Sequence, residues 1–290
     1  MEVALVTGEA PDFAATIDAP LVDALRSRGV DVHAPRWDDP TTDWSRFTVA
    51  VVRTAWDYTT RRDEFLAWAA RAGEVTALWN PSDVLRWNTH KSYLIELEDR
   101  GAPVVPTAWL AQGDRASLAE LVAARGWRRV VVKPAVASGS DGLLRTDGDH
   151  GPASVAQAHL DDLLGTGDVM VQPYLSAVEE TGEVSVVLVD GAVTHVVRKR
   201  PPAGEFRIQE QFGGLYERLE LEGDGADPAA LGRWVYEAVG HDLLYARVDL
   251  LLDDNRAWQV AEVELTEPDL YLGVAPDVGA VLAEATVARA

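Results

Sequence analysis

The sequence predicts an α/β first third followed by two α+β segments. In the first third, short apolar runs alternate with amphipathic helical runs, an order typical of βαβ units with a parallel sheet. The middle third contains short strands that end at proline or at glycine-rich turns. The last third contains two hairpin patterns, which favour antiparallel pairing because a tight turn joins such strands.

The first third is expected to form a small parallel sheet. Its third strand is so apolar that both of its faces should be buried. No G-x-G-x-x-G pattern follows Gly8, so the fingerprint of a dinucleotide-binding domain is absent. The predicted strands are 3–7, 30–34, 49–53 and 76–79, and the predicted helices are 14–28 and 61–72.

Turn and cap residues define the elements of the other two thirds. Asp190-Gly191 predicts a type I′ turn, because both central residues of that turn need a positive φ. Asp227 and Pro228 predict the start of a helix, and Gly240 predicts its end. The expected strands are 104–110, 129–133, 143–146, 169–172, 183–189, 192–198, 245–252 and 256–264, and the expected helices are 88–100, 117–125, 152–164, 227–240 and 277–290.

The composition excludes several classes of function. The chain has 290 residues, and its 47 acidic and 26 basic side chains give a formal charge of −21, which repels nucleic acids and anionic membranes. The absence of cysteine excludes disulfides, thiolate catalysis and cysteine-bound metal. No apolar run is long enough to span a bilayer, and the N-terminus has the pattern of a strand instead of a signal peptide. We therefore expect a cytoplasmic protein without nucleic-acid or membrane partners.

Lysine is rare in this chain, which strongly prefers arginine. The three lysines are Lys91, Lys133 and Lys199. A lysine is a compact point charge, so a phosphate in a narrow cleft favours it over the broad arginine fork. Lys133 ends a strand and precedes the small-residue loop 135–142, called the lid loop below, whose amides could close over phosphates. Lys91 lies at an expected helix start, where it favours a nearby anion. The alternatives are an ordinary turn and a solvated lysine.

Three acidic residues are expected to meet on one face of a hairpin. Glu262 and Glu264 are two apart on a strand, so they share a face, and the hairpin places Asp249 on the neighbouring strand. Like charges so placed repel unless a cation lies among them, and hard oxygen ligands suit Mg²⁺ or Mn²⁺. Arg247 shares the face of Asp249, so an ion-pair network without metal is the alternative.

A strand end in the middle of the chain could bind a nucleotide base. The segment Met170–Leu175 ends a strand at Pro173 and then turns, which leaves backbone groups free for an adenine edge. Glu179, Glu180 and Glu183 follow and could hold a ribose diol. The alternative is an edge strand that a polar loop caps.

The only dense basic cluster lies at His195–Pro202. Strand alternation sends Arg198 and Arg200 to one face and Lys199 to the other, and Arg198 could neutralise a transferring phosphoryl group. A role in nucleic-acid binding conflicts with the total charge. The histidines are scattered without an H-x₃-H pair, so zinc is not expected.

A polar and aromatic group follows the third predicted strand. Ligands often bind at such strand ends, so we expect these residues to contact the substrate. The alternative is an aromatic core plug that contains an Arg–Asp pair. The residues are Arg53, Trp56, Asp57 and Tyr58.

The order of these motifs resembles the ATP-grasp ligases, specifically the glutathione synthetase-like and RimK-like branch. The series runs in order through residues 80–265, behind a βαβ domain. Arg53–Tyr58, Asn80-Pro81, Arg86–Asn88 and Glu264–Tyr271 further resemble a subgroup that contains the O-ureido-serine cyclo-ligase of cycloserine biosynthesis. The resemblance implies the ATP-grasp fold, in which two α+β subdomains sandwich ATP. The implied divisions are a pre-ATP-grasp βαβ domain at 1–87, a central subdomain with the lid loop at 88–175 and a C-terminal subdomain with the metal site at 176–290.

The resemblance also implies roles for individual residues. Glu183, with Glu179 as the second choice, takes the ribose position. Many relatives have asparagine where this chain has Glu264, and the added charge leaves the number of metal ions open. The implied nucleotide-binding residues are Lys91, Lys133, Ser138, Gly139, Gln172, Pro173, Tyr174, Leu175, Glu179 and Glu183. The implied catalytic residues are Arg198, Lys199 and Arg207, and the implied metal ligands are Asp249, Glu262 and Glu264.

The activity that the resemblance implies is an ATP-dependent, ADP-forming ligase with ATP and one or two Mg²⁺ ions, or Mn²⁺ in their place. A small amino-acid-derived substrate would become an acylphosphate, which an amine of the same molecule would attack. An intermolecular, peptide-forming ligase is the alternative, and an ATP-binding regulator or small-molecule kinase on the same fold is an alternative from another class. The expected partner is a small-molecule substrate, and a homo-oligomer is an open expectation because relatives often form dimers or tetramers.

Overall fold

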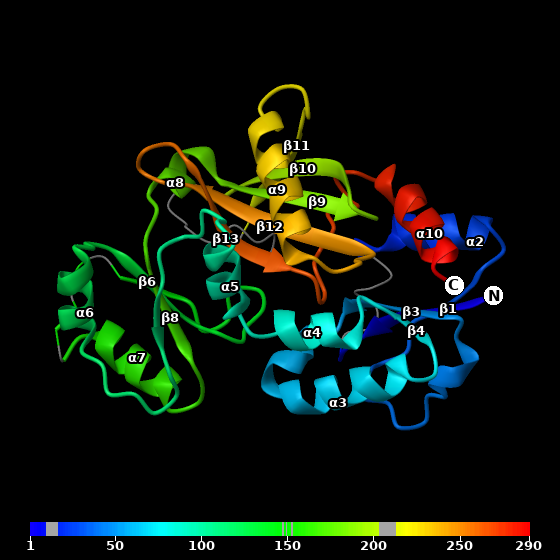
Figure 1. Cartoon of the computed structure of the whole chain (residues 1–290), viewed down its shortest axis with the longest axis horizontal. Coiled ribbons are helices and arrows are strands. Elements are labelled where there is room, and N and C mark those ends of the chain that lie inside the picture. The colour runs from blue at the N-terminus through cyan, green and yellow to red at the C-terminus, as the bar shows by residue number, and fades with distance from the viewer. Residues whose placement is uncertain (10–16, 147, 149, 152, 203–212) are drawn as a thin grey trace.

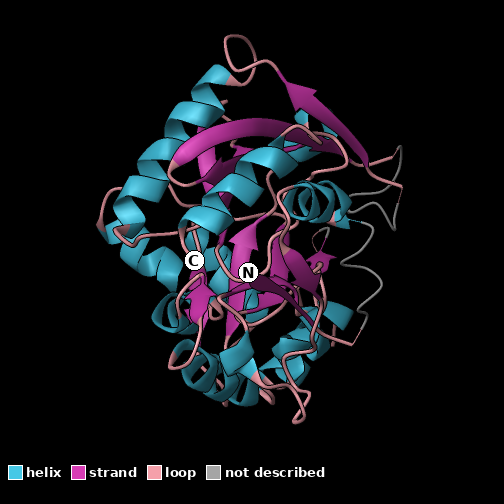
Figure 2. Cartoon of the chain, turned by 90° about the vertical axis from the view of Figure 1, so that its right-hand side faces the viewer, coloured by secondary structure: helices cyan, strands magenta, loops and turns pink. Residues whose placement is uncertain are grey.

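The computed structural model describes residues 1–9, 17–146, 148, 150–151, 153–202 and 213–290. Its strands form three separate sheets, one from each third of the chain (Figure 1). Both chain ends lie at one side of the molecule, and the view onto that side shows them next to each other (Figure 2). None of the helices in the described part combines the length and the apolar character that a membrane crossing requires.

The first sheet is parallel, as predicted, with the strand order β2-β1-β3-β4. Every residue of β3 is buried, which agrees with its apolar sequence. Helix α2 packs on the sheet through Leu21 and Leu25. The strands are β1 (Glu2–Thr7), β2 (Asp31–His33), β3 (Val49–Thr54) and β4 (Ala77–Trp79), and the helices are α2 (Ala19–Ser27) and α3 (Arg62–Gly73).

The second sheet is antiparallel, with the order β5-β8-β6-β7. Two helices cover one apolar face, and Ser117 caps the first of them by accepting a hydrogen bond from the Glu120 N–H. The strands are β5 (Ala108–Leu110), β6 (Val130–Pro134), β7 (Leu144–Thr146) and β8 (Val169–Pro173), and the helices are α6 (Leu118–Arg125) and α7 (Val155–Leu164).

The third sheet is antiparallel, with the order β11-β10-β9-β12-β13. Asp190 and Gly191 both have positive φ between β9 and β10, which confirms the predicted turn. Helix α9 packs on one face of this sheet. The strands are β9 (Glu183–Val189), β10 (Ala192–Arg200), β11 (Leu215–Leu219), β12 (Tyr245–Leu252) and β13 (Trp258–Glu264), and the helices are α8 (Ala177–Thr181), α9 (Ala226–Val239) and α10 (Val278–Ala288).

The other face of β9 changes character along the strand. Glu183 and Ser185 face a polar cavity, whereas Val187 and Val189 belong to the apolar core shared with the first sheet. Helix α10 completes that core by returning to lie beside α2 (Figure 1). The C-terminal helix therefore packs beside α2, in the core that the first and third sheets share, although the sequence groups it with residues 176–290.

Two buried asparagines join the first domain to the third sheet. Asn80 donates to the carbonyls of Tyr245 and Leu265 at 3.0 and 2.7 Å and accepts from the Leu244 N–H at 2.8 Å. Asn88 donates to the Val263 carbonyl and accepts from the Leu265 N–H, both at 2.7 Å. These scarce asparagines therefore position the end of β13, and they do not line the cavity.

The structure corrects several predicted elements. The helix expected at 88–100 starts later, as α5 (Tyr93–Asp99). A helix that was not predicted, α4 (Ser82–Asn88), precedes it and ends at Asn88, whose side chain bonds to the backbone of Val263 and Leu265. Lys91 therefore lies in the turn between them instead of inside a helix start. Helix α8 and strand β11 were not predicted, and helix α5 packs in the core of the third sheet instead of the second.

Candidate functional site

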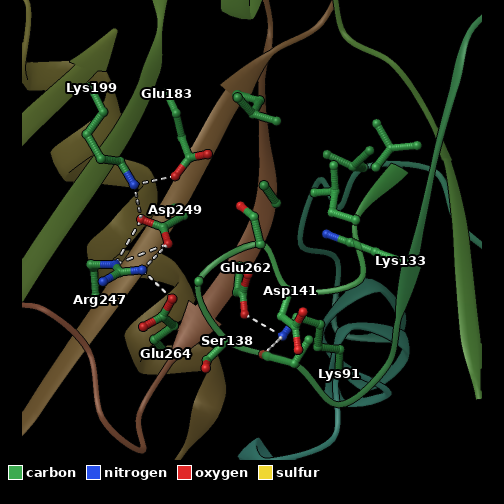
Figure 3. Close-up of a pocket in the computed structure, with 18 of the residues that line it drawn as sticks. Lys91, Lys133, Ser138, Asp141, Glu183, Lys199, Arg247, Asp249, Glu262 and Glu264 are labelled. Atoms are coloured by element: carbon green, nitrogen blue, oxygen red, sulfur yellow. Dashed lines mark hydrogen bonds and ion pairs between the residues drawn. The ribbon is translucent and has the colours of Figure 1, made fainter. Parts of the chain in front are cut away.

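One cavity of about 430 Å³ lies where the second and third sheets meet the end of the first. It gathers charged side chains from segments that are far apart in the sequence (Figure 3). All three lysines of the chain line it, and so do the three acidic residues of the predicted metal site. The charged lining residues are Lys91, Lys133, Asp141, Glu183, Lys199, Arg247, Asp249, Glu262, Glu264, Glu267 and Asp269.

Strands β12 and β13 place the acidic residues as the hairpin pattern predicts. Asp249 lies directly opposite Glu262, and Arg247 lies opposite Glu264. The next residue, Leu250, pairs with Val260, so the register shifts by one residue at Ala261. Such a bulge redirects side chains and is common beside functional sites.

Arg247 connects two of the acidic residues. Its guanidinium donates to Asp249 at 2.8 Å and also to Glu264 (Figure 3). Burial opposes the charge of Asp249, but Arg247 and Lys199 hold its pKa well below the usual range. Burial and the neighbouring carboxylates raise the pKa of Glu264, against the effect of Arg247. The ion-pair network that the sequence left as an alternative is therefore present.

Lys199 completes this network from the neighbouring strand. Its ammonium donates to Glu183 and lies 3.3 Å from Asp249, which also accepts from the Ser185 hydroxyl. Burial opposes its charge, but Asp249 and Glu183 raise the pKa of Lys199 well above the usual value. Lys199 therefore stays protonated inside the cavity.

Lys91 joins the acidic group to the lid loop. Its ammonium lies 2.8 Å from Glu262 and donates to the Ala137 carbonyl at 2.9 Å, and its backbone N–H donates to Ala135. Burial opposes the charge of Lys91, but Glu262 more than offsets that effect and raises its pKa. The ammonium tip and the predicted metal ligands thus meet, as the predicted site requires.

Lys133 differs from the other two lysines. It lines the cavity from β6, and none of the described residues forms a hydrogen bond or ion pair with its ammonium (Figure 3). Burial lowers the pKa of Lys133, and the nearby carboxylates only partly offset this effect. Lys133 is half-buried, and an ammonium that is withdrawn from water without a counter-charge is costly unless a ligand supplies one.

The lid loop turns sharply between β6 and β7. Gly139, Ser140 and Gly142 all have positive φ, a conformation that glycine adopts without strain. A Cβ on Gly142 would lie 3.1 Å from the Pro134 ring, so this position needs glycine for space as well. Ser138 and Gly139 line the cavity, so the loop lies over it.

The far end of the cavity is apolar. Val105, Leu175 and Ala261 form a small buried cluster there, and Leu251 packs against it. Gln172, Pro173 and Tyr174 line the same end, and the Gln172 side-chain amide donates to the Thr107 hydroxyl at 2.9 Å. An apolar slot between two sheets can take a flat aromatic base.

The first domain contributes less to the cavity than predicted. Trp56 lines it and donates from its indole to the Glu267 carbonyl at 3.1 Å. Arg53, in contrast, is fully buried and makes a bidentate ion pair with Asp18 at 2.8 and 2.9 Å. Asp57 accepts from the Trp37 indole, and Tyr58 is buried with its ring stacked on Phe65. Arg53 therefore fits the alternative given by the sequence, a buried Arg–Asp pair within an aromatic core, and not a substrate contact.

Two other predicted residues lie outside the cavity lining, and a third is not among the described residues. Arg198 is on the opposite face of β10 from Lys199 and pairs with Asp224 at 3.3 Å, so the prediction chose the wrong face of that strand for the cavity. Glu179 is outside the cavity lining, where it accepts from the Tyr174 hydroxyl at 2.9 Å. Arg207 lies outside the described residues.

The predicted metal ligands suit Mg²⁺ by their chemistry, because all are hard carboxylate oxygens beside a cavity. Their oxygen atoms do not converge within 4.8 Å; in the described part of the chain only Glu2, Asp31 and His33 do so, at the surface end of β1 and β2. A divalent ion at the cavity therefore competes with Arg247 and Lys91 for the same carboxylates.

Comparisons with known proteins agree with this geometry. Residues 3–80 match the family described as the N-terminal domain of D-cycloserine synthetase DcsG, and residues 102–237 match the ATP-grasp domain of prokaryotic glutathione synthetase. The cycloserine biosynthesis protein DcsG of Streptomyces lavendulae is 33% identical over a match of 285 residues, and the match covers 93% of this chain and 92% of that protein.

Solved structures give the same result. The crystal structure of D-cycloserine synthetase DcsG matches with a TM-score of 0.86 and 32% identity over 100% of this chain and 99% of that one. The ATP-grasp ligase PsnB, solved with Mg and ADP, shares the fold at a TM-score of 0.67 and 16% identity over 99% of this chain and 98% of that one. The ATP-grasp family uses ATP and Mg²⁺. With a relative of this similarity along nearly its whole length, the chain belongs to the ATP-grasp ligases, in the family of the cycloserine biosynthesis protein DcsG, and is an ATP-dependent ligase.

Proposed function

We propose that this ligase activates a carboxylate of a small amino-acid-derived substrate and joins it to a nitrogen of the same molecule. A carboxylate oxygen attacks the γ-phosphorus, the bond to the β–γ bridging oxygen breaks, and ADP leaves. The nitrogen then attacks the acyl carbon, loses a proton, and expels inorganic phosphate. O-Ureido-serine is the first substrate to test, because the DcsG relative belongs to cycloserine biosynthesis.

The observation that carries this proposal is the meeting of all three scarce lysines in one cavity. Lys133, which has no protein partner among the described residues, is the group we assign to the triphosphate. Lys91 can reach the same phosphates only by leaving Glu262, and Lys199 only by leaving Glu183. Arg198 has no place in this scheme, because it lies on the other face of the sheet.

The apolar end of the cavity would hold the adenine between the second and third sheets. Its backbone edge comes from Gln172, Pro173, Tyr174 and Leu175, and Leu251 and Ala261 face it from the third sheet. Glu183 lines the cavity where a ribose diol could reach it, although it is also the partner of Lys199. Glu179 does not line the cavity.

Asp249, Glu262 and Glu264 would hold Mg²⁺, which neutralises charge on the β- and γ-phosphates. Their present cations, Arg247 and Lys91, would then be free to turn to the phosphates and the substrate. Ser138 and Gly139 of the lid loop would cover the reacting groups and exclude water from the acylphosphate.

The direct test is to incubate the protein with ATP, Mg²⁺ and a panel of amino-acid derivatives that includes O-ureido-serine. We expect ADP release, a cyclic product by mass spectrometry, and a hydroxamate when hydroxylamine is added, because only an acylphosphate gives one. A linear dimer as the product would show that the enzyme joins two molecules instead of closing a ring. A stable phosphorylated product without hydroxamate would contradict the proposal in favour of a kinase, and no ADP release with any compound would favour an ATP-binding regulator.

Two variants test the assigned residues. Lys133→Ala and Glu262→Gln should both lose substrate-dependent ADP release, because the first removes a phosphate contact and the second a metal ligand. Glu222→Gln is the matched control, since Glu222 is exposed in a loop. Full activity in both active-site variants would remove the basis of the assignment.

A further inference from the structure

Glu267 is a fully buried acidic residue of the cavity, and none of the described residues forms an ion pair with it. It lies in the segment that follows β13, and its side chain is buried at 6% exposure. Its carboxylate accepts from the Tyr58 hydroxyl. Burial raises the pKa of Glu267 to about 7, which reflects the cost of this charge. Such a group favours a cationic ligand.

The other acidic residues near it are already engaged. Glu262 pairs with Lys91, Glu264 with Arg247, and the Asp269 carboxylate accepts from the Tyr271 N–H at 2.7 Å. Asp141 is exposed on the lid loop, away from the buried wall. Asp269 lacks an ion pair too, but it is only half-buried, so Glu267 is the fully buried carboxylate of the described lining without one.

The position of Glu267 is fixed from several sides. The Trp56 indole donates to the backbone carbonyl of Glu267 at 3.1 Å. The Tyr245 hydroxyl donates to the backbone carbonyl of Thr266, the preceding residue, at 2.9 Å. Thr266 also donates from its hydroxyl to Asn88 at 3.1 Å. A buried carboxylate held this firmly is preorganised for a ligand, since it loses little freedom on binding.

The charge balance of the cavity points the same way. Seven carboxylates and four cationic side chains line it in the described part of the chain. ATP with its magnesium is anionic or neutral, so the nucleotide does not supply the missing positive charge. The ammonium of an amino-acid substrate is a cation that can be placed against Glu267, and an aromatic wall such as Trp56 suits an ammonium group.

Glu267 also lies at the right part of the cavity. In an amino acid the ammonium is one carbon away from the carboxylate, so an ammonium subsite must border the phosphates. Lys91 contacts Glu262 at 2.8 Å, and its charge also lowers the pKa of Glu267. The same lysine therefore borders the phosphate region and Glu267.

We propose that Glu267, positioned by the buried Tyr58 hydroxyl, forms with Trp56 the subsite that binds the ammonium group of the amino-acid substrate and selects against compounds that lack it. This inference rests on the proposed function, because it concerns the second substrate of that reaction. Trp56 lines the cavity beside Glu267, whereas Tyr58 is buried behind the lining and reaches Glu267 only through its hydroxyl.

The test measures ADP release with O-ureido-serine and with its des-amino analogue, which keeps the carboxylate and the ureido group. We expect wild-type protein to prefer the amino compound by about 10- to 100-fold in kcat/KM, the range for a hydrogen-bonded ion pair. In Glu267→Gln the KM for the amino compound should rise until this preference is nearly lost. The affinity for Mg-ATP, measured without the second substrate, should stay within about two-fold.

Three controls separate the subsite from a structural role. Glu267→Gln should unfold at the same or a higher temperature than wild type, since it removes an unmatched buried charge. Glu267→Asp should recover part of the preference, and Glu222→Gln should keep all of it. A preference unchanged in Glu267→Gln, or an equal loss of Mg-ATP affinity, would overturn the inference while the ligase activity stands. If no amino compound releases ADP from wild-type protein, the proposed function fails and the inference fails with it.

Discussion

The two walls of the cavity differ in how their cations are balanced. On the wall from the third sheet, Arg247 and Lys199 are each held by two carboxylates. On the wall from the second sheet, Lys133 has no partner within the described residues, and the lid loop beside it contains residues with positive φ. The paired wall therefore contributes to the folded state before any ligand binds, whereas the unpaired wall gains its counter-charge only from the nucleotide.

The largest effect should come from breaking the paired wall. Arg247→Met leaves Asp249 and Glu264 as buried charges without their main partner, and we expect a loss of about 3–5 kcal/mol in the free energy of unfolding. Urea denaturation measures this loss. Arg233→Met is the control, because Arg233 is exposed on α9 and should change the stability by less than about 0.5 kcal/mol. A loss for Arg247→Met as small as that of the control would show that the network is solvated.

The unpaired wall should give the opposite pattern. Lys133→Met should lower kcat/KM for ATP by about 100-fold, the scale of one charge-assisted contact in a dry site, and leave the unfolding free energy unchanged or higher. Lys91→Met should lower both quantities, because it also leaves Glu262 without its partner. Steady-state ADP release and urea denaturation of the same preparations make the comparison. A strongly destabilised Lys133→Met protein would mean that this lysine serves the fold.

The sequence predicted most of the paired wall, for a physical reason. A strand has a period of two, so Glu262 and Glu264 had to share a face, and the hairpin had to bring Asp249 beside them. The same period separated Lys199 from Arg198, but it could not say which face of β10 would meet the cavity. That choice depends on which face α9 covers, and this is a property of the tertiary packing.

Residues outside regular structure were harder to predict. Asp18, the partner of Arg53, is 35 positions away in the sequence, and no local pattern connects the two. Asn88 ends α4 and bonds to β13, whereas the sequence suggested that a helix begins at this residue. Glu267 follows the end of a strand, where the period of two no longer applies. Long-range contacts decide all three positions.

The lid loop should show a smaller effect that depends on position. Gly139→Ala and Gly142→Ala both place a side chain at positive φ, which costs about 1–2 kcal/mol. Gly142→Ala should lose more, because its Cβ also meets the Pro134 ring, whereas nothing lies within 4 Å of a Cβ at Gly139. Urea denaturation ranks the two variants. Equal losses would show that Pro134 moves aside freely.

The smallest effect is a pH dependence that distinguishes the two walls directly. Burial lowers the pKa of Lys133 below 10.5 in the folded protein, so over a window just below 10.5 the unfolded chain binds more protons than the folded one. Wild-type stability therefore rises with pH in that window, and the stability that Lys133→Met gains over wild type should shrink there.

The carboxylate partners raise the pKa of Lys199, so its contribution to stability is fully present below pH 10.5 and falls only at higher pH. The difference between wild type and Lys199→Met should accordingly stay constant over the same window. Parallel pH curves for wild type and Lys133→Met would show that Lys133 is solvated or already paired, and the contrast between the walls would disappear.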